Sequence, residues 1–192
     1  MEDKDSCLML MANLETPLSI ASILEEGDVK EIIYDSHVTI FYANDQVIDR
    51  KDLVYNLPND KLRIQKDEEE NLIPVLDLFE LGSFENDDSD FLILKMKTGS
   101  EWYDMVTSLN SKLVKIYGIK ESFETYNPHL TLAELIKGTA KKYLDSTVLR
   151  KVISNSMIHF EDFALNQYNL TNFCGVDRFF RIRERKEIDK EL

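Results

Sequence analysis

The sequence predicts a mixed fold of strands and helices, built from two halves that share the same order of elements. Segments typical of β-strands alternate along the chain with segments whose apolar residues recur at helical spacing. The order of helix, strand and helix occurs twice. The chain has 192 residues, 43% of them hydrophobic, with only 6 glycines and 4 prolines. This is long enough for one substantial domain or two small lobes with a real core.

The first elements are a strand, a helix and a second strand. Residues 7–11 ("CLMLM") form a short apolar run that predicts a buried strand. Thr16 is expected as the N-cap of the next helix, with Pro17 in its first turn and Gly27 just past its end. The run "SHVTIFY", residues 36–42, alternates as a strand does.

The middle of the chain predicts a helix and then a hairpin. Apolar spacing favours a helix over residues 49–57, and residues 71–84 are expected to form one or two strands broken near Pro74. The acidic run "ENDDSD", residues 85–90, separates these from the strand "FLILKMK", residues 91–97. Two strands joined by a short polar loop indicate a hairpin with a solvated end.

The clearest helix is predicted over residues 101–117. Thr98 and Glu101 fit a capping box, and Gly118 is expected to end the helix. Its apolar stripe consists of Trp102, Met105, Val106, Leu109, Leu113 and Ile116.

The last part of the chain predicts strand, helix and strands. "PHLTLAE", residues 128–134, is the strand, and the helix is expected around residues 140–153. Residues 157–165 ("MIHFEDFAL") and 176–184 ("VDRFFRIRE") alternate as strands do. We expect one domain over residues 1–192, with residues 186–192 as a frayed tail.

The charge of the chain limits its partners. The formal net charge is −13 and the isoelectric point is near 4.7. Proteins that coat long DNA or RNA neutralise many phosphates with Lys and Arg, so a long nucleic acid is not expected as a partner. Any ligand of the nucleic-acid type should be small. The charge does not exclude a local basic cleft.

The cysteines and the apolar runs indicate a cytoplasmic protein. Cys7 and Cys174 are far apart and belong to no metal-binding pattern, so neither a disulfide framework nor a zinc site is expected. The N-terminal apolar run is short and follows acidic residues, unlike a signal peptide. No stretch approaches the roughly 20 apolar residues of a membrane span, so no membrane contact is expected.

A pattern of histidine, apolar residue, threonine and apolar residue occurs twice, although the chain has only 3 histidines. Residues i and i+2 of a strand point to the same face. His37 and Thr39 therefore share one side of their strand, and His129 and Thr131 share one side of theirs. One such strand alone would indicate a structural histidine, whose hydrogen-bonding groups are satisfied within the fold. Two copies in similar surroundings favour a shared site.

Paired imidazoles and hydroxyls suit acid–base chemistry on a phosphodiester. An imidazole with a pKa near 6.5 can remove a proton from the attacking oxygen while a second, protonated imidazole supplies one to the leaving oxygen. Threonine hydroxyls can hydrogen-bond the non-bridging phosphate oxygens, where charge develops. This scheme needs no metal or other cofactor, and the sequence has no cluster of ligands at metal-binding spacing.

The pair "HVTI" (37–40) and "HLTL" (129–132) resembles the tandem motif of the 2H phosphoesterase superfamily. The resemblance covers most of the chain, and "CLMLMANLETPLSIASI" and "YNPHLTLAEL" are similar to members from phages and bacteria. It implies an α+β, bilobal 2H phosphoesterase fold, with two pseudo-symmetric lobes of antiparallel sheet, helices outside and the active site in the central cleft. It also implies metal-independent cleavage of phosphodiesters in ribonucleotides.

Several substrates fit such an enzyme. Members of the superfamily act as RNA 2′,3′-cyclic phosphodiesterases, once called RNA ligases, or on 2′-5′ oligoadenylate. Phage anti-CBASS nucleases destroy cyclic oligonucleotide signals, as immune evasion. The negative charge favours a small cyclic or oligomeric ribonucleotide, with processing of RNA ends as the alternative. A nucleotide-sequestering protein is the non-enzymatic alternative. The presence of the threonine in both motifs argues against it. The attacking group, the identity of the base and the oligomeric state stay open.

Three aromatic residues are candidates for stacking on a base, namely Phe41, Trp102 and Tyr126. The apolar helical stripe that Trp102 begins favours the core for it instead. His159 has no threonine two residues on and is expected to be an ordinary strand residue. The basic run "RFFRIRERK", residues 178–186, fits a charged edge strand better than a phosphate site.

Overall fold

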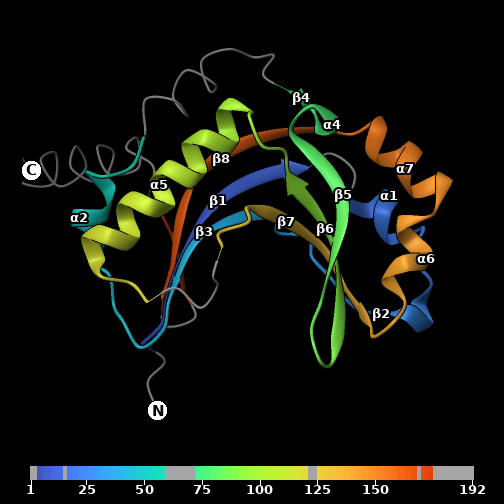
Figure 1. The fold of residues 1–192 in the computed structure, drawn as a ribbon, viewed down its shortest axis with the longest axis horizontal. Helices are drawn as coiled ribbons and strands as arrows, with labels where there is room; N and C mark the ends of the chain where they lie inside the picture. Colours follow the sequence, from blue (N-terminus) through green and yellow to red (C-terminus); the bar gives the residue numbers. More distant parts are fainter. Residues whose placement is uncertain (1–3, 15–16, 59–71, 121–124, 168–169, 175–192) are drawn as a thin grey trace, which may run out of the picture.

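The computed structural model describes residues 4–14, 17–58, 72–120, 125–167 and 170–174, which form a nine-stranded sheet with helices on its outside (Figure 1). The strands are β1 (Ser6–Leu14), β2 (Val29–Ile32), β3 (His37–Ala43), β4 (Ile73–Pro74), β5 (Phe79–Glu85), β6 (Ser89–Met96), β7 (His129–Ile136), β8 (Met157–Gln167) and β9 (Leu170–Phe173). The helices are α1 (Pro17–Ala21), the 3₁₀ turn η1 (Glu26–Asp28), α2 (Arg50–Val54), α4 (Val75–Leu78), α5 (Glu101–Tyr117), α6 (Ala140–Leu144) and α7 (Thr147–Ser154).

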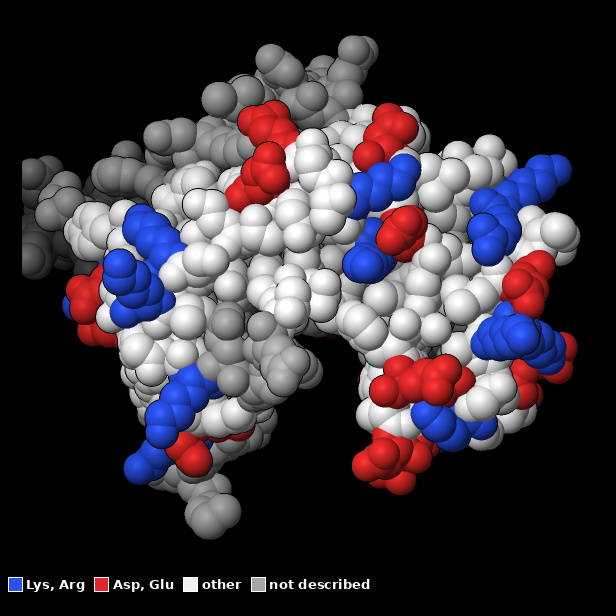
Figure 2. Space-filling model, viewed as in Figure 1, with Lys and Arg blue, Asp and Glu red and all other residues white. Residues whose placement is uncertain are grey.

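The sheet is antiparallel and strongly curled. Its order is β4-β8-β1-β3-β7-β6-β5, with β2 added to β7 and β9 added to β8. The β1–β3 pair and the β6–β7 pair meet where β3 contacts β7. The sheet curves over like an arch, with the β5–β6 hairpin as one limb (Figure 1). The space-filling surface is indented between the two limbs of this arch (Figure 2).

The hydrophobic core lies between the outer face of the sheet and the helices. Strand residues such as Val38 and Leu130 are fully buried in one cluster with Val106 and Leu113 of α5. Burying such a side chain stabilises the fold by about 1.5–3 kcal/mol. α1, α6 and α7 lie outside the limb formed by the β5–β6 hairpin, on the other side of the arch from α5 (Figure 1). The inner face of the sheet is therefore not covered by these helices (Figure 1).

The α+β class and most predicted elements are confirmed. β1 contains the strand predicted at 7–11, β5 and β6 form the predicted hairpin, and α5 has the predicted bounds, with Gly118 in the left-handed conformation (φ 62°) at its end. Within the part of the chain described, no helix is both long and apolar enough to cross a membrane. The strand predicted at 176–184 and the tail at 186–192 lie outside the described residues.

Several boundaries differ from the prediction. Ser100, and not Thr98, caps α5, because its hydroxyl accepts from the N–H of Tyr103 at 3.0 Å. The first helix, α1, already ends at Ala21. A helical turn, α4, stands between β4 and β5. The helix predicted around 140–153 is two helices, since the side chain of Ser146 starts α7 by accepting from the N–H of Leu149. β2 and β9 were not predicted.

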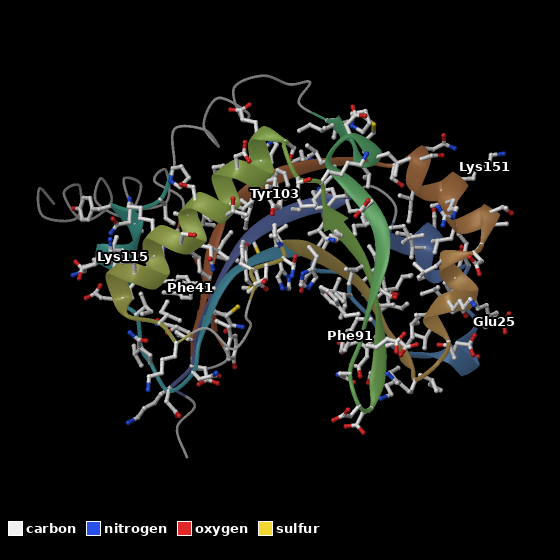
Figure 3. The ribbon with its side chains drawn as sticks, in the orientation of Figure 1. Glu25, Phe41, Phe91, Tyr103, Lys115 and Lys151 are labelled. Carbon is white, nitrogen blue, oxygen red and sulfur yellow. The ribbon has the colours of Figure 1, made fainter. Side chains whose placement is uncertain are left out.

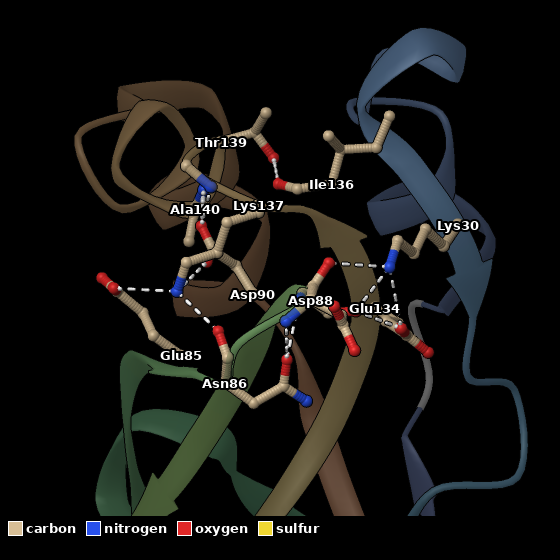
Figure 4. A network of polar contacts seen from close by, with 12 residues as sticks. Lys30, Glu85, Asn86, Asp88, Asp90, Glu134, Ile136, Lys137, Thr139 and Ala140 are labelled. Carbon is tan, nitrogen blue, oxygen red and sulfur yellow. Dashed lines mark hydrogen bonds and ion pairs between the residues drawn. The ribbon is translucent and has the colours of Figure 1, made fainter.

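A polar network joins the start of β6 and the end of β7 to the start of α6 (Figure 4). The carboxylate of Asp90, 1% exposed, accepts hydrogen bonds from the N–H groups of Gly138 (2.9 Å) and Ala140 (3.1 Å). The ammonium of Lys137 lies 3.6 Å from the other carboxylate oxygen. Because buried polar groups need partners, this single side chain fixes the turn between β7 and α6.

Candidate active site

The register of β3 and β7 brings the two histidine–threonine motifs together. Val38 lies opposite Leu130 in an antiparallel pair. One residue further along on either side, this register places His37 across from Thr131 and Thr39 across from His129. The two imidazoles therefore occupy opposite corners of a four-residue square, and the two hydroxyls occupy the others. Diagonal neighbours of this kind have Cα atoms about 7–8 Å apart.

The four side chains lie on the face of the sheet that the helices leave open. Val38 and Leu130, at the centre, are both 0% exposed and pack into the core. Neighbouring residues of a strand point to opposite faces. The residues that flank them, His37, Thr39 and their β7 counterparts, are half-buried and point away from the core. The square is thus anchored by the core and reachable from the inner face.

Each imidazole is held by a carbonyl two residues before it. His37 Nδ1 lies 2.8 Å from the carbonyl oxygen of Asp35, and His129 Nδ1 lies 2.7 Å from that of Asn127. A carbonyl oxygen can only accept, so Nδ1 carries a proton and donates it. In the neutral ring the lone pair is then on Nε2. Both histidines can therefore exchange a proton through Nε2.

The backbone around each histidine repeats the same pattern. Ser36, just before His37, accepts from the N–H of Ala12 through its carbonyl oxygen at 2.9 Å, and Pro128, just before His129, accepts from that of Met96 at 2.9 Å. These bonds join each motif strand to its outer neighbour, β1 or β6. The two halves are therefore alike down to single hydrogen bonds.

A β-bulge also recurs at the same place in both halves. The register shifts between Leu8 and Met9 against β3 and between Leu92 and Ile93 against β7. The residue left without a partner is Ile40 in β3 and Leu132 in β7, each three positions after the histidine of its motif. A bulge places two consecutive residues on one face and bends the strand. In both motif strands the two residues that follow the threonine are accordingly buried.

His129 is more enclosed than an ordinary surface histidine. The ring of Phe84, on β5, meets the imidazole edge-on with 4.5 Å between centroids and an interplanar angle of 87°. Burial is the main reason that the pKa of His129 lies below its ordinary value of 6.5, and the nearby His37 lowers this pKa further. The hydrogen bond to Asn127 opposes both effects. His129 is thus biased towards the neutral form, which can accept a proton.

Removing the aromatic ring of Phe84 should raise the pKa of His129. In the variant Phe84→Ala, water reaches the imidazole and stabilises its charged form. We expect the NMR titration of His129 to move to higher pH than in the wild-type protein. An unchanged or lower pKa for His129 would show that Phe84 does not cause the desolvation.

Thr39 is positioned by two neighbours, Cys7 and Tyr126. Its hydroxyl hydrogen-bonds the thiol of Cys7, and its backbone carbonyl accepts from the hydroxyl of Tyr126 at 2.7 Å. Burial raises the pKa of Cys7 to about 11, although the bond to Thr39 lowers it, so the thiol stays protonated. Through this hydrogen bond Tyr126 ties the segment before β7 to β3.

Phe41 and Trp102 lie in the core, so the structure does not support a stacking role for either. Phe41 is 3% exposed because the bulge in register opposite Ile40 breaks the alternation that would have placed it beside Thr39. Figure 3 shows Phe41 next to α5. Trp102 is 5% exposed, with its ring 4.2 Å from that of Phe160. The apolar helical stripe correctly favoured the core for Trp102.

The remaining polar candidates lie away from the square or outside the described residues. His159 is on β8, where Nε2 is 3.7 Å from a carboxylate oxygen of Glu161. The basic run at 178–186 is not described. No group of three or more His, Cys, Asp or Glu side chains within the described ranges is placed to hold a metal ion.

No protein-family model matches the chain, and no curated protein matches it in sequence. Among solved structures it is similar to Usb1 of Kluyveromyces marxianus, at 12% identity and a TM-score of 0.49, over 91% of this chain and 99% of that one. A structure of the same protein with uridine monophosphate matches at 11% identity and a TM-score of 0.47, over 92% and 100%.

Proposed function

We propose that the protein is a phosphodiesterase that cleaves a phosphodiester bond in a small ribonucleotide by acid–base catalysis from two histidines. The observation that carries this proposal is the pairing of Val38 with Leu130, which sets the two imidazoles diagonally on the open face of the sheet with a threonine beside each. Because both Nδ1 atoms are engaged by carbonyl oxygens, the two Nε2 atoms are the ones available to a substrate.

The lowered pKa of His129 suggests how the roles divide. Neutral His129 takes a proton at Nε2 from the attacking hydroxyl, whose oxygen forms a new bond to phosphorus. The bond between phosphorus and the leaving oxygen breaks, and that oxygen takes a proton from Nε2 of protonated His37. Each positioned proton transfer contributes about 10²–10⁴ in rate. The O–H group that attacks belongs either to a water molecule or to a ribose 2′-hydroxyl.

The two threonines would stabilise the charge that develops on phosphate. Thr39 and Thr131 stand at the corners between the imidazoles, so their hydroxyls can donate to the two non-bridging oxygens of a phosphate at the centre of the square. The hydrogen bond between Thr39 and Cys7 limits the rotamers of Thr39 before substrate arrives. A preset donor of this kind needs little reorganisation during the reaction.

The substrate would be bound between two lobes and would be compact. The β1–β3 pair and the β6–β7 pair carry one motif each and meet at the square, as two lobes flanking a central site would. The protein carries a net charge of −13, and acidic and basic side chains are interspersed on the face in Figure 2. A long RNA that needs many phosphate contacts fits such a surface less well than a small nucleotide does.

Turnover of a substrate panel tests the proposal. The protein, treated with EDTA, is incubated with 2′,3′-cyclic mononucleotides, 2′-5′ oligoadenylate, cyclic di- and trinucleotides, and RNA with a cyclic end. We expect chromatography to show cleavage of at least one small nucleotide without a divalent ion. Preference for the RNA end would instead favour end processing. Tight binding without any turnover would contradict the enzyme and indicate a nucleotide-sequestering protein.

A further inference from the structure

The two halves of the site differ at the residue that stands beside each histidine. Met11 of β1 lies opposite His37, and Lys95 of β6 lies opposite His129. Both positions follow their strand's bulge by the same number of residues, so they correspond in the repeated pattern. The first half has a half-buried apolar side chain there, and the second half has an exposed cation.

The backbone geometry directs Lys95 towards the site. The N–H of Met96 donates to the carbonyl oxygen of Pro128 at 2.9 Å, which makes Lys95 and His129 a non-hydrogen-bonded pair. Such pairs have Cα atoms only about 4.5 Å apart, with their side chains on the same face. Leu94, the residue before Lys95, is 0% exposed and faces the core. Lys95 therefore projects from the same open face as the square.

The charge of Lys95 is not committed elsewhere in the described part of the chain. The carboxylate facing it across the sheet is that of Glu80, its partner on β5. Lys95 and Glu80 form no ion pair with each other within 4.0 Å, and Glu80 is exposed. An exposed pair of this kind would contribute little to stability in any case. The ammonium group is thus free to meet an anion that reaches the inner face.

We propose that Lys95 binds a second phosphate of the substrate, next to the phosphate that is cleaved. This inference rests on the proposed function, because the square of histidines and threonines is taken to hold the scissile phosphate. Lys95 lies one strand outside that square and adds a charged donor on the β6 side only. A substrate with phosphates on two neighbouring linkages would then bind in one orientation, with its second phosphate towards β6 and an uncharged part towards Met11. The substrate class is an oligonucleotide rather than a cyclic mononucleotide.

Calorimetric binding of two small ligands tests this inference without turnover. Adenosine 3′-monophosphate has one phosphate, and adenosine 3′,5′-bisphosphate has two. We expect Lys95→Gln to weaken binding of the bisphosphate about tenfold, as loss of a charge-assisted hydrogen bond does, and to change binding of the monophosphate less than threefold. Lys95→Arg should keep most of the affinity. Lys115→Gln, on the outer helix α5 (Figure 3), is the matched control and should change neither.

The outcomes separate this inference from the proposed function. Equal weakening for both ligands would mean that Lys95 acts on the first phosphate, and would overturn the proposal. No change with either ligand, or no preference of the wild-type protein for the bisphosphate, would overturn it as well. If the wild-type protein prefers the bisphosphate through Lys95 but cleaves no phosphodiester, the second-phosphate site stands and the enzymatic function falls.

Discussion

Replacing either His37 or His129 with Ala should lower kcat of the proposed phosphodiesterase activity by about 10²–10⁴, the contribution of one positioned proton transfer. The imidazoles stand diagonally across the β3–β7 pair, so each would serve a different oxygen of the reaction. Removing both should cost little more than removing one, because groups that act as a unit are not additive. KM should change much less than kcat, since the threonines and Lys95, which we propose to bind phosphate, are retained in these variants.

The third histidine is the matched control for these variants. His159 lies on β8 of the same sheet, outside the square, and its imidazole is partly exposed. His159→Gln should keep wild-type kcat, while far-UV circular dichroism shows that all variants are folded. Full activity in either alanine variant of the square would refute the two-histidine mechanism. Loss of activity in all three variants would indicate a general effect of histidine replacement on the sheet.

The pH profile tests the assignment of the roles. A neutral base and a protonated acid coexist over a limited pH range, so kcat/KM should be bell-shaped. If His129 is the base, the acidic limb reports its pKa, which burial lowers. The acidic limb should therefore move to higher pH in Phe84→Ala, in the same direction as the NMR titration. An alkaline limb that moves instead would assign His129 as the acid.

The sequence predicted the histidine–threonine positions because alternation is a local property. His37 and Thr39 share a face in any regular strand, whatever its neighbours are. The same alternation would put Phe41 on that face, but the structure buries it in the core. The bulge arises from the pairing of β3 with β1, which lies far away in sequence. The residues around Phe41 do not predict it. Strand pairing, not strand propensity, decides such positions.

The residues that lie next to the four motif residues could not be predicted from the sequence either. Lys95 and Phe84 come from the β5–β6 hairpin, which was predicted as a hairpin but could not be placed beside β7. Cys7 belonged to a predicted strand whose neighbour was unknown. The cap of α5 was misplaced for a simpler reason, since Thr98 and Ser100 are both good capping residues and only the turn at Gly99, with φ of 83°, selects Ser100.

Replacing Asp90 with Ala should destabilise the protein by about 3 kcal/mol, the cost of losing one side of a buried, charged network. Two backbone N–H groups, those of Gly138 and Ala140, would lose their acceptor, and Lys137 would lose a buried partner. For a chain of this size the loss corresponds to a fall in Tm of about 6–12 °C. Asp87→Ala, in the exposed part of the same hairpin, should change Tm little and serves as the control.

The pH dependence of this loss identifies the charge as its cause. Burial on its own would raise the pKa of Asp90, but the N–H groups of Ala140 and Gly138, together with Lys137, outweigh it and leave this pKa below its ordinary value. A carboxyl group whose pKa is lower in the folded chain stabilises the fold above its unfolded pKa of about 3.9, and this contribution is lost as pH falls through the folded pKa. The difference in unfolding free energy between wild type and Asp90→Ala should therefore be full at pH 7 and shrink below about pH 4. Urea unfolding at a series of pH values measures this difference. A constant gap across that range would assign the loss to packing and hydrogen bonds that do not depend on the charge, and the network of Figure 4 would then act without its ion pair.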